Sequence, residues 1–418
     1  MSTTAATKES LKCKICGNLV EAGLQHVCEE CFGPLEVQYD LEEISRTLTR
    51  ETIEGRYPDL FRYRELLPLK GPPKIGTGVG FTPFLPAPTL GEAIGIQDLW
   101  IKCDSSNHPT QSFKDRVVAV AINRAIEFGL DVVGCASTGN LANAVAAQAA
   151  AADLEAWIFV PADLEAEKIL ATAVHGPQLV RIEGTYDDVN RLCAEVADDF
   201  GWGIVNVNLR PYYSEGSKSM AFEIAEQLGW AAPRNVVAPM AGGSLITKLQ
   251  KGFIELDEVG IIEGGRDVSL YGAQADGCAP IIHALHEGID RIRPVQEPNT
   301  IAKSLAIGNP ADGPFAVKTM KESGGWGETV SDDEIREGMY LLGRAEGIFT
   351  ETAGGVTVAT AAKLAKQGRI EQDGPTVLCI TGNGLKTPDP IRVVVDFGSA
   401  IEPRLSEVER LRGESTRR

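Results

Sequence analysis

The chain has 418 residues, of which 43% are hydrophobic and 23% charged, so it can bury a large core and is not intrinsically disordered. Its formal net charge of -18 excludes a general electrostatic attraction to nucleic acid or to an anionic membrane. No apolar run reaches the ~18 residues of a membrane span, and the first dozen residues lack the apolar core of a secretory signal. We therefore expect a cytoplasmic protein that binds any anionic substrate through local groups.

Four of the nine cysteines form two C-x2-C pairs near the start of the chain: Cys13 with Cys16, and Cys28 with Cys31. This pattern predicts a structural Zn²⁺ site of the zinc-ribbon type, the alternative being four free thiols. Four thiolates leave no position for water, so we expect no catalysis by this metal. The other five cysteines are expected to behave as small hydrophobes.

From Phe81 onward, short β-rich runs alternate with longer amphipathic stretches, which predicts an α/β fold with parallel sheets. The predicted strands are LWIKC, VVGCAS, AWIFVP, IVNVNL, NVVAPM and VLCIT; the predicted helices span 113–128, 139–152, 164–175, 217–229 and 244–256. The segment 34–75 is expected to serve packing. The charged C-terminal residues indicate a solvated helix or a frayed tail.

Lys114 lies in the first of four unusual loops that each lead from a predicted strand toward a helix or turn. Ligands of parallel α/β sheets bind beyond the carboxyl ends of the strands, where such loops lie. The helix dipole disfavours a cation at a helix start. The lysine is therefore either paired with a carboxylate or serves as a neutral amine that bonds covalently, and the residues alone favour the ion pair.

The other three loops are rich in glycine and small polar residues. They are Ser137-Thr138-Gly139-Asn140, Ala241-Gly242-Gly243-Ser244 and Thr381-Gly382-Asn383-Gly384. Hydroxyls, amides and free N–H groups at a helix start can bind a carboxylate or a phosphate, although capping or a simple turn would account for each loop alone. The P-loop and G-x-G-x-x-G patterns are missing, which excludes the two common nucleotide-binding motifs.

Together and in this order, the loops resemble those of the threonine synthase family, which consists of pyridoxal-phosphate (PLP) enzymes of fold type II. The cysteine pairs and six segments carry the resemblance over nearly the whole chain: NHPTQSFKDRVV, CASTGN, VNLRPYYSEGSKS, IAKSLAIGNPADG, GIFTETAGG and ITGNGLKT. The resemblance implies a tryptophan-synthase-β-like fold, in which two three-layer α/β domains follow a small zinc-ribbon-like segment.

The resemblance also assigns a role to each loop. Lys114 would form the Schiff base with PLP and shuttle protons. Asn140 would bind the cofactor's 3-oxygen and, with Ser137 and Thr138, receive the substrate carboxylate. Gly242, Gly243 and Ser244 would form the cup for the cofactor phosphate. Thr381 would face the pyridine nitrogen, and because a hydroxyl does not hold that nitrogen protonated, the cofactor would be a weaker electron sink.

A substrate phosphate needs its own cationic pocket, for which the candidates are Asn208, Arg210, Ser217 and Lys218. The chain departs here from the family's Asn-Pro-x-Arg-x-Glu-Gly pattern, because Tyr213 stands where the arginine would fall. It also has Asn383 where many members have a histidine, so no histidine acid/base is expected in that loop.

The implied reaction converts O-phospho-L-homoserine and water into L-threonine and phosphate, by γ-elimination followed by β-hydration. Three alternatives remain open: a cysteate synthase, a threonine or serine dehydratase, and a zinc-ribbon interaction protein that has lost catalysis. The segment from Arg210 to Lys218 argues against a dehydratase, which needs no second phosphate pocket. The retained Lys114 and Asn140 argue against loss of catalysis.

We expect five parts in the chain. They are a zinc-ribbon-like segment (1–35), a packing segment (36–75), a larger PLP-binding domain (76–105 with 210–400), a smaller domain with the reactive lysine (106–209) and a tail (401–418). The family resemblance also implies a homodimer, with no nucleic-acid or membrane partner.

Overall fold

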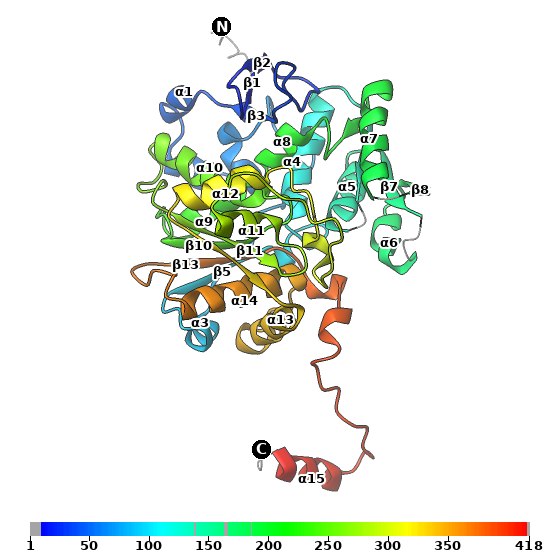
Figure 1. Ribbon diagram of the computed structural model, residues 1–418, viewed down its shortest axis with the longest axis vertical. Coiled ribbons are helices and arrows are strands. Elements are labelled where there is room, and N and C mark those ends of the chain that lie inside the picture. Colours follow the sequence, from blue (N-terminus) through cyan, green and yellow to red (C-terminus); the bar gives the residue numbers. More distant parts are fainter. Residues whose placement is uncertain (1–9, 138, 163–165, 185, 416–418) are drawn as a thin grey trace.

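The computed structural model describes residues 10–137, 139–162, 166–184 and 186–415. It contains a small three-stranded sheet, a six-stranded sheet and a four-stranded sheet (Figure 1). In the part of the chain so described, no helix has both the length and the apolar character that crossing a membrane requires.

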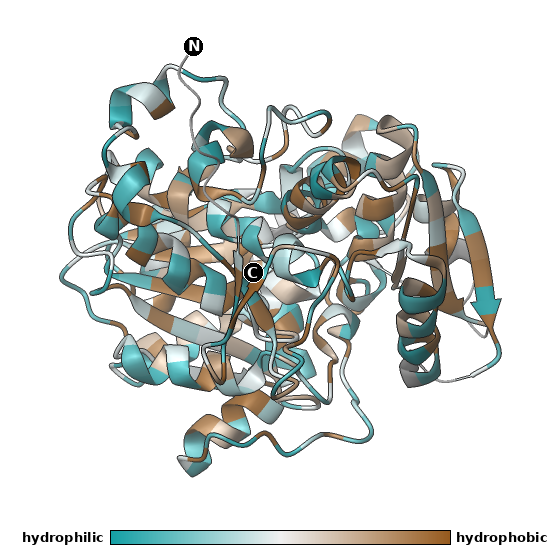
Figure 2. Ribbon diagram, turned by 90° about the horizontal axis from the view of Figure 1, so that it is seen from above, coloured by the Kyte–Doolittle hydropathy of each residue, from teal (hydrophilic) through white to brown (hydrophobic). Residues whose placement is uncertain are grey.

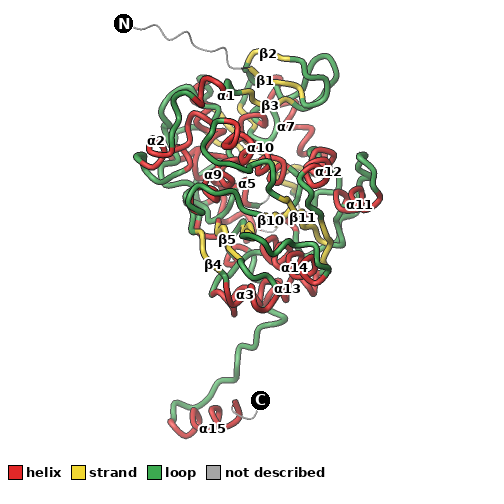
Figure 3. The backbone as a smooth tube through the Cα atoms, turned by 90° about the vertical axis from the view of Figure 1, so that its left-hand side faces the viewer, coloured by secondary structure: helices red, strands yellow, loops and turns green. Residues whose placement is uncertain are grey.

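The three-stranded sheet is antiparallel and contains β1 (Ser10–Cys13), β2 (Leu19–Glu21) and β3 (Leu35–Gln38) in the order β2-β1-β3. We call residues 10–38 the ribbon. It lies at one end of the molecule, above α8 (Arg210–Glu215) and α10 (Ser244–Glu258) in Figure 1, and far from α3 (Pro88–Ile94) in Figure 3. The short helices α1 (Leu41–Ser45) and α2 (Arg50–Glu54) follow it.

The six-stranded sheet has the order β12-β11-β10-β13-β5-β4 and is parallel except for the edge strand β4. Its strands are β4 (Phe84–Pro86), β5 (Leu99–Cys103), β10 (Asn235–Pro239), β11 (Ser269–Ala275), β12 (Gly327–Val330) and β13 (Thr376–Ile380). Every residue of β10, β11 and β13 is buried, as expected for parallel strands covered on both faces.

Helices cover both faces of this sheet (Figure 1). One layer contains α9 (Lys218–Gln227), α10, α11 (Pro280–Glu287) and α12 (Gly313–Glu322), and the other contains α3, α13 (Asp332–Glu346) and α14 (Thr352–Lys366). Figure 2 shows hydrophobic residues concentrated in the strands and hydrophilic residues on outward helix surfaces. This is the three-layer arrangement expected for the larger domain.

The four-stranded sheet is parallel, in the order β8-β7-β6-β9. It contains β6 (Val132–Ala136), β7 (Glu155–Pro161), β8 (Gln178–Ile182) and β9 (Gly203–Ile204), accompanied by α4 (Lys114–Glu127), α5 (Asn140–Ala151), α6 (Ala166–Ala173) and α7 (Tyr186–Phe200). Alternate residues of β7 join different cores: Ile158 packs with the α5 side and Phe159 with the α7 side. The predicted α/β fold is thus confirmed.

The prediction of a strand over IVNVNL is wrong beyond Ile204. The Asn208 side chain accepts a hydrogen bond from the Ile204 N–H (2.8 Å) and donates to the Trp202 carbonyl (2.8 Å). These bonds turn the chain toward α8, because an asparagine side chain can replace the ladder partners of a strand. Residues 392–415, which we call the C-terminal arm, leave the body of the molecule and end in α15 (Leu405–Ser415) (Figure 1).

Candidate functional site

Lys114 is the first residue of α4, and the loop after β13 fixes the backbone beside it. The Phe113 N–H donates to the Thr381 carbonyl oxygen (2.8 Å). The half-buried Lys114 Nζ donates to the Tyr213 hydroxyl (2.9 Å). No carboxylate among the described residues forms an ion pair with it. The ion pair that the residues alone favoured is therefore not found, and the amine remains available to another group.

Asn140, the first residue of α5, contacts a buried carboxylate that the sequence analysis missed. Its Nδ2 donates to both carboxylate oxygens of Glu351, at 3.0 and 3.2 Å. Burial raises the pKa of Glu351, while the bond from Asn140 and the charges of Lys386 and Lys114 lower it; the net direction is upward. The signal for this residue was an acidic side chain inside the apolar segment GIFTETAGG.

Gly242, Gly243 and Ser244 form the turn between β10 and α10 that was predicted to hold a phosphate. Gly243 has φ +91°, and a Cβ there would lie 3.0 Å from the Asp312 backbone oxygen. Only glycine tolerates both constraints. Ser244 begins the 15-residue helix α10, whose first N–H groups and dipole favour an anion.

Two further predicted residues each directly follow a parallel strand. Ser137 follows β6, and its hydroxyl accepts a hydrogen bond from the Gly139 N–H (3.3 Å). Thr381 is buried directly after β13. Thr138, the remaining member of the predicted carboxylate loop, lies outside the described residues.

Of the four residues predicted to bind the substrate phosphate, the structure brings only Arg210 to an accessible position. Its guanidinium donates to Asp312 Oδ2 (2.8 Å), and 29% of its side chain is exposed. Asn208 and Ser217 are buried, and Asn208 is engaged in the turn described above. Lys218 is fully buried and forms ion pairs with Glu215 (2.7 Å) and Glu255 (2.6 Å). In this structure Asn208, Ser217 and Lys218 are not open to a ligand.

Asp115 fixes the loop that precedes the lysine. Its carboxylate accepts hydrogen bonds from the Thr110 N–H (3.1 Å) and hydroxyl (2.7 Å) and from the Ser112 N–H (3.2 Å). Burial raises the pKa of Asp115 to about 6, against the lowering effect of these bonds.

The four clustered cysteines converge as the spacing predicted. Their sulfur atoms all lie within 4.8 Å of one another, with Cys13 Sγ 3.4 Å from Cys31 Sγ and Cys16 Sγ 3.7 Å from Cys28 Sγ. Gly33 supports the geometry, because a Cβ there would lie 2.8 Å from Cys13 Sγ. Four thiols at this separation fit a tetrahedral metal ion of the zinc type.

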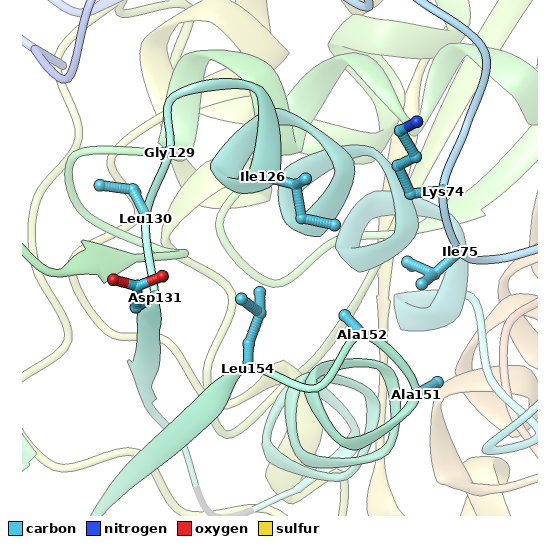
Figure 4. A pocket seen from close by; sticks show the side chains of 9 residues that line it. All are labelled: Lys74, Ile75, Ile126, Gly129, Leu130, Asp131, Ala151, Ala152 and Leu154. Atoms are coloured by element: carbon cyan, nitrogen blue, oxygen red, sulfur yellow. The ribbon is translucent and has the colours of Figure 1, made fainter.

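A surface hollow of about 350 Å³ is lined by none of the predicted cofactor-binding or substrate-binding residues (Figure 4). Asp131 and Leu154, which line it, directly precede β6 and β7, so the hollow lies at the amino ends of these strands. Parallel sheets bind their ligands at the opposite end. We assign the hollow no function.

Comparison with known proteins identifies the class of enzyme to which the chain belongs. The family model described as "Pyridoxal-phosphate dependent enzyme" matches residues 75–382. A threonine deaminase isoform 2 from Solanum lycopersicum aligns with a TM-score of 0.62 and 22% identity, covering 80% of this chain and 84% of its own. Maize serine racemase aligns with a TM-score of 0.60 and 18% identity, covering 80% of this chain and 94% of its own. The chain belongs to the pyridoxal-phosphate-dependent enzymes and has their fold type II architecture.

Curated relatives narrow the class. The chain is 37% identical to the threonine synthase of Methanocaldococcus jannaschii over 397 residues, which cover 92% of this chain and 97% of that protein. It is 34% identical to the threonine synthase of Methanosarcina acetivorans, covering 95% and 97%. Within its class, the chain belongs to the threonine synthase family.

Proposed function

We propose that the chain converts O-phospho-L-homoserine and water into L-threonine and phosphate, using PLP. The observation that carries the proposal is the environment of Lys114, whose amine lies at a helix start with a hydroxyl partner and no described carboxylate partner. A lysine at this position is poorly placed for a structural ion pair and well placed to bond with an aldehyde.

The residues present fit the cofactor. Lys114 would hold it covalently, Asn140 would donate to its ring oxygen, and Thr381 would face its ring nitrogen. The turn from Gly242 to Ser244 would receive its phosphate, because Gly243 leaves space where a Cβ would collide with backbone. When bound, PLP supplies an electron sink for charge that develops on the substrate carbons.

The remaining chemistry belongs to the side chains. The freed Lys114 amine would move protons at Cα, Cβ and Cγ of the substrate, and its 2.9 Å bond to the Tyr213 hydroxyl would orient it and offer a proton path. Ser137 and Thr138, which precede α5 in the sequence, would bind the substrate carboxylate. Arg210 would bind the phosphate that leaves from Cγ.

The converging sulfur atoms support a structural Zn²⁺ ion held by Cys13, Cys16, Cys28 and Cys31. We further propose a cytoplasmic homodimer with the domain boundaries given above. The C-terminal arm supports self-association, because it projects from the body with Val393, Phe397 and Leu405 each at least 74% exposed (Figure 1).

The test is to supply PLP-loaded protein with O-phosphohomoserine and to quantify phosphate and amino-acid products. Equimolar phosphate and threonine are expected. The Lys114→Ala variant should lose turnover and the absorbance band of covalently bound cofactor, whereas the exposed-lysine control Lys318→Ala should keep both. Phosphate with 2-oxobutyrate, or cysteate formed from phosphoserine and sulfite, would contradict the proposal and select a relative instead.

A further inference from the structure

A small recess of about 20 Å³ lies between the ribbon and the helices α8 and α10. Lys14 and His26 of the ribbon line it from one side, and Arg210, Ser244 and Asp312 line it from the other. The Lys14 backbone is fixed there, because its N–H donates to the carbonyl of Pro34 (3.0 Å), which follows the second cysteine pair. The ribbon thus places a cation beside the first residue of α10.

The charges around this recess are not balanced. The Arg210 guanidinium lies 2.8 Å from Asp312 Oδ2, and Lys14 Nζ lies 3.9 Å from Asp312 Oδ1, so two cations share one carboxylate. Lys248, a third cation of the lining, is already neutralised by Glu36 and Glu215. Within residues 10–137, 139–162, 166–184 and 186–415, Lys14 Nζ donates no hydrogen bond, although only 17% of its side chain is exposed. Besides Asp312, it contacts the ring of Phe315, whose centroid lies 3.9 Å from Nζ, a weaker interaction than a charge-assisted hydrogen bond.

The recess also connects to the reactive lysine through α8. Arg210 and Ser214, one turn apart on this helix, both line the recess, and Tyr213 beside Ser214 contacts Lys114 Nζ. The six-residue helix α8 therefore carries both two residues of the recess and the group that contacts the amine.

We infer that this recess binds a phosphate monoester dianion and that Lys14 of the ribbon is one of its ligands, in place of the buried Lys218. The inference rests on the proposed function, since a phosphate ester is both its cofactor and its substrate. Asp312 acts as an internal competitor: its carboxylate holds Arg210 until a phosphate takes its place. The volume of the recess, which suits about one water, requires that exchange.

The experiment titrates inorganic phosphate into the PLP-loaded protein by calorimetry, a readout that does not depend on turnover. Lys14→Gln should weaken phosphate binding about tenfold or more, as expected for one charge-assisted hydrogen bond. The control Lys12→Gln removes an exposed lysine of β1, two residues away in the ribbon, and should leave the affinity unchanged. Asp312→Asn should tighten binding, a gain that damage to the fold would not produce.

A second arm separates the two sources of phosphate by comparing the affinities of PLP and pyridoxal for apoprotein. If the recess takes the substrate phosphate, Lys14→Gln raises KM for the phosphate ester and leaves PLP affinity unchanged. If it takes the cofactor phosphate, PLP affinity falls and pyridoxal affinity does not. Wild-type values for Lys14→Gln in both arms would overturn the inference, whether or not the protein makes threonine.

Discussion

At the scale of single residues, the site combines an amine with two buried carboxyl groups. The amine of Lys114 has a hydroxyl partner, whereas Asp115 and Glu351 are buried carboxyls whose pKa values burial raises. A carboxyl with a raised pKa makes stability depend on pH in a defined direction.

Asp115 gives a prediction of that kind. Its pKa, about 6 in the folded chain against 3.8 as the ordinary value, means that the folded state binds more protons between these two values. The stability that this carboxyl contributes is therefore complete at low pH and declines as the pH rises through 6. From pH 5 to pH 7.5, the wild type should lose about 1 kcal/mol relative to Asp115→Asn.

Thermal unfolding midpoints at the two pH values measure this difference. The exposed Asp276 provides the control, because Asp276→Asn should show the same pH dependence as the wild type. The prediction would be contradicted if the unfolding midpoints of Asp115→Asn and of the wild type changed by the same amount between the two pH values.

At the scale of elements, the turn into α10 depends on one glycine. Gly243→Ala should destabilise the apoprotein by about 1–3 kcal/mol, because alanine at φ +91° is strained and its Cβ would crowd the Asp312 backbone oxygen at 3.0 Å. Gly242→Ala is a matched control: its φ is not positive and no heavy atom lies within 4 Å of the new Cβ. Equal unfolding midpoints for the two variants would show that the turn is not strained.

We predict that the ribbon binds zinc through its four clustered cysteines. Cys28→Ser should reduce bound zinc from about one ion per chain to almost none, since the serine hydroxyl is a poor ligand for this metal. Metal analysis of the purified protein measures this, with the buried but unclustered Cys278→Ser as control. Zinc retained by Cys28→Ser, or lost by Cys278→Ser, would exclude the assignment.

At the scale of the whole molecule, a buried charge network joins β5, α4 and α9. Arg116 pairs with Asp104 (2.7 Å) and Glu223, and Lys102 pairs with the same Glu223 (2.7 Å), all with no exposed side-chain surface. Arg116→Met should cost about 3–5 kcal/mol, because two carboxylates would then share one cation in the interior.

Urea unfolding measures this loss. The surface pair of Arg191 and Asp188 supplies the comparison, since 71% of the Arg191 side chain is exposed and Arg191→Met should change stability by less than about 1 kcal/mol. Comparable effects of the two substitutions would mean that the buried network contributes no more than a surface pair.

The order and type of the elements around the site could be predicted from sequence, because β-rich runs, amphipathic periods and glycine turns are local signals. Lys218 shows where this fails: nothing in the chain near it reveals that Glu255 lies 2.6 Å away. Glu351 was missed for the same reason, since its partner Asn140 is 211 positions distant. Lys14 was given no role, because the sequence around Cys13 and Cys16 was interpreted only as a metal site.

The central position of β13 determines when the lysine loop can acquire its shape during synthesis. β13 lies between β10 and β5, and the turn after it supports the loop before α4 through bonds such as Asn383 Nδ2 to the Ser105 carbonyl, 278 positions apart. On the ribosome, Lys114 therefore emerges long before the strand that orders its surroundings. A nascent chain that ends before Thr376 would contain Lys114 but lack β13 and the turn that orders its loop. Competence to bind the cofactor therefore arises only when this last strand is inserted.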